Sequence, residues 1–166
     1  MDQMACSVGG MVNIDFKDPT KPIVKKVPTE FEKYDYSLCI VDTKGDHVDL
    51  TDDYAMIPSE MKKVANFLGE DYLRDCDSNE FYIRLDEIRE AVGDRPVLRA
   101  IHFFNEEYNV KNAVSSLENG KFVEFLDAIR KSGNSSFKYL QNVYTTRDIQ
   151  HQNISVALAL SESLLR

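Results

Sequence analysis

The stretch PVLRAIHFFNEEYNVKNAVSSLE, residues 96–118, reads as one long helix around which the rest of the chain can be interpreted. Proline suits the first turn of a helix because its missing N–H is not needed there, so Pro96 marks the start. Asn119-Gly120 is typical of a helix end. At 1.5 Å per residue the helix would be about 35 Å long. Apolar side chains that recur at helical spacing mark its buried stripe: Val97, Ile101, Phe104 and Tyr108.

The same spacing predicts helices on both sides of this stretch. Residues 54–68 and 81–92 repeat apolar side chains every three or four positions and stop before Gly69 and Gly93. Pro58 is tolerated only in a first turn, which places the first of these starts near Tyr54. A further helix runs from Phe122 to Gly133. Asp148 is expected to cap a final helix with one apolar face, formed by Ile154, Ala157, Leu158, Ser161 and Leu165.

The first third of the chain is predicted to be β-structure. Residues 11–16 alternate apolar and polar side chains, and a short strand follows at 23–27. The run Tyr36–Val41 is apolar throughout, as expected of a central strand covered on both faces, with Cys39 packed inside it. Short connections favour antiparallel pairing. The predicted fold class is α+β, an antiparallel sheet packed with helices.

Composition excludes several classes of protein. The chain has 166 residues, 43% of them hydrophobic, enough for one domain or two small ones. Its net charge of −8 and the absence of a Lys/Arg stripe argue against nucleic-acid binding. No apolar run approaches the roughly 20 residues that cross a bilayer, and the N-terminus does not resemble a signal peptide. We therefore expect a cytoplasmic protein without a membrane partner.

Local motifs for metal or nucleotide chemistry are missing from the sequence. Its three cysteines are too far apart for a paired CxxC zinc site, so no metal site is predicted. The sequence contains neither a Walker-type phosphate loop nor GxGxxG or GxSxG. His102 lies beside the apolar stripe of the long helix, where a structural histidine is more common than a ligand or a base.

Six short motifs, in order along the chain, resemble bacterial galactokinases of the GHMP sugar kinase family. The opening MDQMACSVGGMVNIDF resembles the segment around the family's "GxMDQ" motif, which supplies the catalytic aspartate. The others are YSLCIVDTK at 36–44, LTDDY at 50–54, LRAIH at 98–102, ENGKF at 118–122 and KSGNS at 131–135.

This resemblance implies a fold, a reaction and two site residues. Residues 1–35 would end the N-terminal kinase domain, and 36–166 would form an incomplete C-terminal domain with ferredoxin-like elements, truncated at both ends. The implied activity is phosphorylation of galactose at C1, in galactose metabolism, with ATP and Mg²⁺ as cofactors. Asp2 matches the catalytic aspartate and Tyr54 the tyrosine that contacts galactose. The simpler interpretations are that Asp2 is a terminal residue or helix cap and that Tyr54 packs its ring on the core.

Departures from the family pattern leave other interpretations open. The family's "GGLSSSA"-like phosphate loop and its "GxGxGG" motif are not in this sequence, so we expect the chain alone to be inactive and to bind no ATP or Mg²⁺. The alternative is a non-catalytic sugar-sensing or oligomerising module derived from such a kinase. A kinase for a different sugar is a third possibility. Apolar surface that lacks its covering would favour a homodimer.

Overall fold

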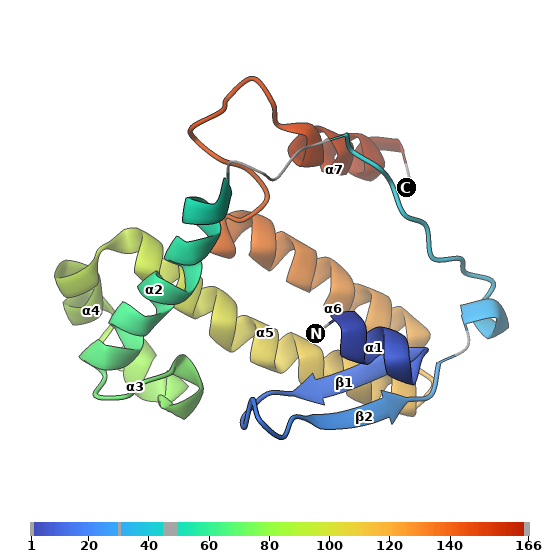
Figure 1. The fold of residues 1–166 in the computed structure, drawn as a ribbon, viewed down its shortest axis with the longest axis horizontal. Coiled ribbons are helices and arrows are strands. Elements are labelled where there is room, and N and C mark those ends of the chain that lie inside the picture. The colour runs from blue at the N-terminus through green and yellow to red at the C-terminus, as the bar shows by residue number, and fades with distance from the viewer. Residues whose placement is uncertain (1, 30, 45–49, 165–166) are drawn as a thin grey trace. The chain divides into compact units, whose positions relative to one another are not determined.

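The computed structural model describes residues 2–29, 31–44 and 50–164. These residues form mostly helices and one small antiparallel sheet, so the predicted α+β class is confirmed in this coarse sense (Figure 1). They divide into two compact units, one of residues 1–40 and 108–131, the other of 41–107 and 132–166. The family boundary expected at residue 35 stays a prediction.

The first unit contains the β-hairpin that the sequence predicts. Strands β1 (Met11–Asp15) and β2 (Ile23–Val27) pair antiparallel, with Met11 opposite Val27 and Asp15 opposite Ile23. The connecting turn is closed by Asp18, whose carboxylate accepts hydrogen bonds from the backbone N–H and the hydroxyl of Thr20. The short helix α1 (Asp2–Val8) precedes the hairpin, and a 3₁₀ turn, η1 (Phe31–Tyr34), follows it.

Aromatic rings form the core of the first unit. Phe122 lies at its centre, with the Tyr34 ring stacked on it at 4.2 Å between centroids and the Phe31 ring edge-on at 5.7 Å. Val27 and Phe125 are buried in the same cluster. The hairpin and η1 thus pack on the parts of helices α5 (Asp94–Glu118) and α6 (Phe122–Ser135) that belong to this unit.

The prediction of a central strand at Tyr36–Val41 is wrong. This segment is in no strand, and the side chains of Leu38 and Ile40 are 80% and 94% exposed. Cys39 is exposed as well, not packed. An apolar run becomes a strand only where a neighbouring backbone accepts and donates its hydrogen bonds. The sheet in the described part of the chain has only the two strands β1 and β2, which pair with each other.

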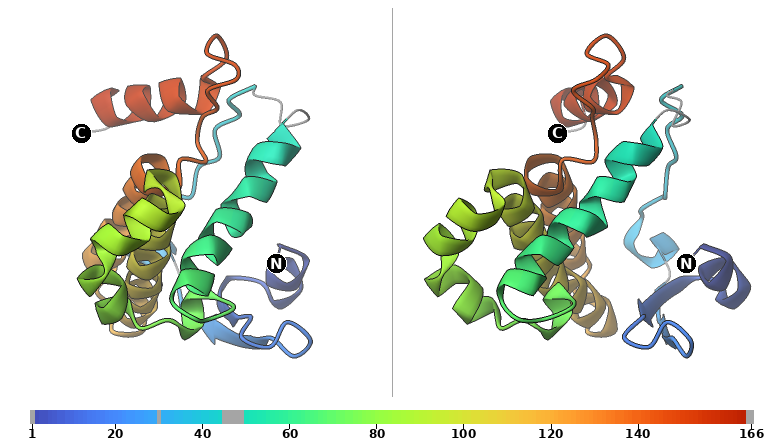
Figure 2. Two further views of the ribbon diagram at one scale, coloured as in Figure 1. Left: turned by 90° about the vertical axis from the view of Figure 1, so that its left-hand side faces the viewer. Right: turned by 60° about the vertical axis from the view of Figure 1, so that its left-hand side comes forward.

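Helices form the second unit (Figure 2). They are α2 (Thr51–Phe67), α3 (Ser78–Ile83), α4 (Leu85–Val92), the first part of α5 (Asp94–Glu118), the end of α6 (Phe122–Ser135), η4 (Ser136–Leu140) and α7 (Asn153–Leu164). A short 3₁₀ turn, η3 (Leu73–Asp75), connects α2 to α3. Each segment predicted to be helical from apolar spacing contains helix, and α5 begins within two residues of the predicted start at Pro96.

Four helices differ from the prediction at a boundary. Helix α7 begins at Asn153, so Asp148 does not cap it; the Asp148 carboxylate instead accepts hydrogen bonds from the backbone N–H groups of Gln150 and His151 in the preceding segment.

The helix expected over 81–92 is two helices that break at Arg84, and the first begins earlier because the Asp77 side chain caps it through the Asn79 N–H. Helix α2 begins at Thr51, which leaves Pro58 in its interior. Helix α6 continues through Gly133 to Ser135. Packing therefore outweighs the local preference of proline and glycine at both positions.

The core of the second unit is made by side chains of α2, α3, α4 and α5. Val64, Phe81 and Ile88 have no exposed surface, and Ala100 closes the cluster from α5. Helices α2 and α4 lie side by side over this core (Figure 2). Among the described residues, no helix combines the length and the apolar character that a membrane span requires.

Replacing Phe81 by alanine is expected to destabilise the chain by about 3–5 kcal/mol, because the change empties a fully buried site. Ile83, two residues further along α3, is 83% exposed and provides the control. The Ile83→Ala variant should change the free energy of unfolding by less than about 0.5 kcal/mol. Urea denaturation measures both values, and equal losses would contradict the core as described.

Candidate functional site

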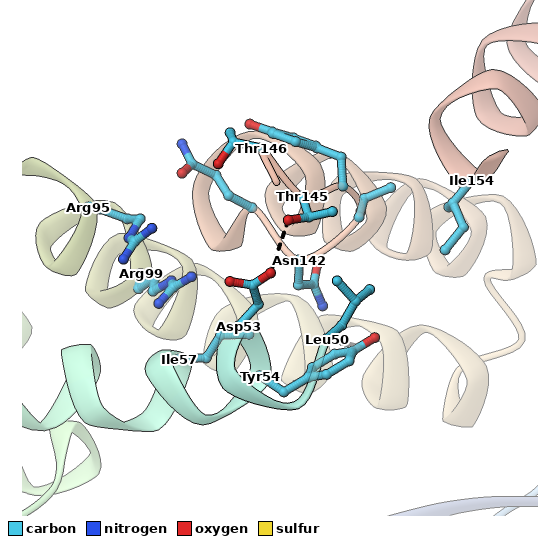
Figure 3. A pocket seen from close by; sticks show the side chains of 13 residues that line it. Leu50, Asp53, Tyr54, Ile57, Arg95, Arg99, Asn142, Thr145, Thr146 and Ile154 are labelled. Atoms are coloured by element: carbon cyan, nitrogen blue, oxygen red, sulfur yellow. Dashed lines mark hydrogen bonds between the residues drawn. The ribbon is translucent and has the colours of Figure 1, made fainter. Parts of the chain in front are cut away.

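A cavity of about 100 Å³ lies in the second unit, between the start of α2, the start of α5 and the segment that follows η4 (Figure 3). We call it the α2–α5 pocket. Its lining residues are Leu50, Asp53, Tyr54, Ile57, Arg95, Arg99, residues 141–146 and Ile154.

Helical spacing explains why these side chains meet. Asp53 and Ile57 lie one turn apart on α2, and Glu60 extends the same face by another turn. Arg95 and Arg99 lie one turn apart on α5. The polar faces of α2 and α5 therefore both point toward the α2–α5 pocket.

Glu60 is the electrostatic centre beneath the pocket. Glu60 is only 6% exposed, and both of its carboxylate oxygens accept hydrogen bonds from Arg95 Nε at 3.0 Å. Arg99 Nη1 donates to Glu60 Oε2 at 2.7 Å. The hydrogen bond to Glu60 raises the pKa of Arg95. Burial lowers the pKa of Arg99, and the charge of Glu60 opposes that shift. Since guanidinium groups stay protonated in proteins, this is a group of two cations and one anion.

Asp53 closes the pocket on the side of the 141–146 segment. Its carboxylate accepts a hydrogen bond from Thr145 Oγ1 at 3.0 Å (Figure 3) and lies 3.4 Å from Arg147 Nη2. The backbone carbonyl of Thr145 accepts a bond from Gln152 Nε2 at 2.9 Å. These contacts fix the position of the Thr145 hydroxyl opposite α2.

The arrangement suits a small neutral ligand with several hydroxyl groups. Two carboxylates, Asp53 and Glu60, balance the two guanidinium groups of α5. Arg147, which also lies near Asp53, is balanced by Asp52, 3.6 Å from its Nη1, so no excess positive charge is available to attract a polyphosphate. Asp53 can accept hydrogen bonds, Arg95 can donate them, and the hydroxyls of Tyr54 and Thr145 can do both. Within residues 2–29, 31–44 and 50–164, no group of three acidic, histidine or cysteine side chains could hold a metal ion.

The two residues expected at the site lie in different units. Tyr54 lines the α2–α5 pocket from the first turn of α2, with 45% of its surface exposed. Asp2 is exposed in the first turn of α1, in the first unit. Tyr54 is therefore at a pocket, and its contact with a sugar stays a prediction. The catalytic role of Asp2 stays a prediction.

The sequence interpretation missed the buried charges of this site. Glu60, Arg95 and Arg99 were not singled out, although their spacing carries a signal. A carboxylate seven residues after Asp53 lies on the same face of α2, and two arginines four residues apart share a face of α5. Opposite charges on two amphipathic helices of one unit could have suggested a buried ion pair.

His102 lies on α5 three residues after Arg99, and its environment is that of a structural histidine. It is buried, and its Nδ1 is 2.9 Å from Ser135 Oγ in a hydrogen bond. Burial lowers the pKa of His102, and the nearby charge of Glu106 opposes that shift. The folded chain therefore holds this imidazole neutral.

Comparisons with known proteins give no relative: no family model, curated protein or solved structure matches the chain. The functional proposal below therefore depends on the residues and on the geometry of the pocket.

The buried His102 should make stability depend on pH. Its folded pKa is below the ordinary value of 6.5, so its contribution is complete above that value and is lost as the pH falls through and below it. We expect the free energy of unfolding to decrease from about pH 7 to about pH 5, and His102→Gln to flatten this slope. His151→Gln, at an exposed histidine, is the control. An unchanged slope in His102→Gln would contradict the assignment.

Proposed function

We propose that this chain is part of a galactokinase-type sugar kinase and that its α2–α5 pocket binds a sugar. The observation that carries the proposal is the position of Tyr54. The family resemblance selects this residue from the sequence alone, and it lines a small pocket whose charges are balanced and whose edge is rich in hydroxyl groups.

The chemistry of the pocket supports a sugar more than a charged metabolite. Sugar hydroxyls donate to carboxylates and accept from guanidinium groups, and Asp53 and Arg95 provide one of each. Tyr54 adds a ring against which the apolar face of a sugar can pack. A phosphate would instead require unpaired positive charge, whereas both arginines are already paired with Glu60.

Asp2 is the residue we propose for proton transfer. A sugar hydroxyl is a poor nucleophile at neutral pH, and a carboxylate within hydrogen-bond reach can orient it and accept its proton. Asp2 matches the family aspartate that has this role. Its exposed position in the first turn of α1 leaves its carboxylate accessible to a ligand.

ATP and Mg²⁺ stay an expectation for the complete kinase that the resemblance implies. This sequence contains no Gly-rich phosphate loop like that of the family. We assign the sugar to the α2–α5 pocket and proton transfer to Asp2, each considered within its own unit. The phosphate-binding groups of a complete kinase would have to come from other sequence.

A non-catalytic sugar-sensing or oligomerising module is the second candidate. Exposed apolar side chains favour it: Val156, Leu160 and Leu164 on α7 are each more than half exposed, as is Ile40. Such surface is typical of a region that another polypeptide covers, either a second copy or further kinase sequence. Sugar binding that never leads to turnover would favour the module.

Galactose binding tests the role of Tyr54. We expect the chain to bind galactose. Tyr54→Phe should weaken the affinity by about two- to tenfold, because it removes one hydrogen bond between neutral groups. Tyr72→Phe, at an exposed tyrosine of the same unit outside the pocket, should leave it unchanged. NMR titration gives the dissociation constants. A Tyr54→Phe chain with unaltered affinity would exclude this residue from the sugar site.

The role of Asp2 requires turnover, so it is tested in a kinase that joins this chain to a Gly-rich phosphate loop. Asp2→Asn keeps the shape of the side chain but cannot accept a proton. We expect kcat to fall by about 10²–10⁴ while the KM for galactose changes little. Asp18→Asn, at the hairpin turn, is the matched control. Near-normal turnover of the Asp2→Asn enzyme would exclude proton transfer by Asp2.

A further inference from the structure

We infer that Arg99 is a positioning residue: with Glu60 it fixes the 141–146 wall of the α2–α5 pocket relative to α2. The inference concerns the geometry of the pocket, and its consequence for sugar affinity rests on the proposed function.

Arg99 makes two bonds to two different elements. Its Nη1 donates to Glu60 Oε2 on α2 at 2.7 Å, and its Nε donates to the backbone carbonyl of Leu140 at 3.3 Å. The side chain is 5% exposed, so water does not compete for either bond. One buried guanidinium therefore connects α2, α5 and the last residue of η4.

The residue that follows this contact is where the pocket wall begins. Gln141 has left-handed backbone angles, φ 57° and ψ 45°, and its N–H donates to the Ser136 carbonyl at 2.9 Å. A residue with a Cβ adopts this conformation only when its surroundings hold it there. The bond from Arg99 reaches the carbonyl of the peptide that joins Leu140 to Gln141. It sets the direction in which residues 141–146 leave η4.

Arginine is suited to this task where lysine is not. The planar guanidinium presents Nη1 and Nε in fixed directions, so it can bond to a carboxylate and to a carbonyl at the same time. A lysine at position 99 would keep the charge opposite Glu60, but its three N–H donors share one nitrogen and cannot occupy the separate positions of Nη1 and Nε. Arg99→Lys thus separates the connection to η4 from the ion pair.

The connection made by Arg99 also influences the end of the pocket that contains Asp53 and Thr145, where we propose that the sugar binds. Asp53 lies two helical turns before Glu60 on α2, and its bond to Thr145 joins α2 to the 141–146 wall. The distance between Asp53 and Thr145 depends on both elements that Arg99 joins. Without the bond to Leu140, the alignment of this wall with α2 would depend more heavily on the Asp53–Thr145 bond.

Hydrogen exchange measures the proposed connection without any ligand. In Arg99→Lys, the Gln141 amide should exchange about five- to tenfold faster, the effect of losing one buried hydrogen bond, while the amides of α2 keep their rates. Arg95→Lys is the matched control, because Arg95 shares the acceptor Glu60 but has no hydrogen bond to the Leu140 carbonyl. A uniform increase across α2 and η4, or no change at Gln141, would overturn the inference.

A double-mutant cycle separates positioning from a general structural role. Thr145→Val removes the bond to Asp53, together with the acceptor of the Arg147 N–H, without changing charge. Thr145→Val changes the unfolding equilibrium constant by some factor. That factor should differ at least about threefold between the wild-type chain and the Arg99→Lys variant, because the two contacts hold the same segment. Additive effects would contradict the inference. Gln141→Val, which disfavours the left-handed backbone while keeping Arg99, should accelerate exchange at residues 140–142 in the same way.

Galactose titration connects the inference to the proposed function. If the wild-type chain binds galactose, Arg99→Lys should weaken that affinity by about the factor seen in exchange, and Arg130→Lys, at an exposed ion pair of the other unit, should not. Wild-type chain that does not bind galactose would overturn the proposed function. The exchange and coupling results would still decide the role of Arg99.

Discussion

The buried carboxylate of Glu60 is the constraint on which the helical unit depends. A charge at this depth is tolerated only if its hydrogen bonds are satisfied, and two arginines of α5 satisfy them. Removing one partner of such a group costs far more folding free energy than the absence of the whole group would, because an uncompensated charge then stays buried. The register between α2 and α5 is therefore set by a charge, while the apolar core around Phe81 supplies most of the burial.

Three polar contacts along one face of α5 also fix the position of this helix through directional bonds. Arg99 bonds to the Leu140 carbonyl, His102 to Ser135, and Glu106 accepts a bond from Ser132 at 2.6 Å. Successive steps of three or four residues bring these α5 side chains to the end of α6 and to η4. Directional bonds at regular spacing select one alignment of two helices, which a stripe of aliphatic side chains alone would not do. The geometry of the α2–α5 pocket therefore depends on this alignment.

Sequence patterns predicted the helices and the hairpin well, because apolar spacing and turn residues are local signals. The paired strands β1 and β2 are one example, and the α5 stripe is another through Val97, Ile101 and Phe104. Tyr108, expected in the same stripe, is 65% exposed, so the stripe ends one turn earlier than predicted. The strand expected at Tyr36–Val41 failed for a non-local reason, since a strand needs a partner that composition cannot show. The sequence did not predict the pocket; of its lining residues, the family resemblance singled out Tyr54 alone, and the sugar contact implied for it stays a prediction. Its charges depend on which face of α2 meets which face of α5, a property of the packed unit and not of either helix alone.

The exposed run Tyr36–Val41 has a consequence for how this chain behaves in concentrated solution. Six residues without charge, proline or glycine, rich in β-branched and aromatic side chains, have the composition of segments that stack into cross-β fibrils. Most folded proteins bury such a segment or interrupt it with a charge. Here the nearest charges, Asp35 and Asp42, flank the run on both sides and act as gatekeepers. Colloidal stability of the isolated chain thus depends on the charges of these two aspartates, which keep copies of the run from stacking on one another.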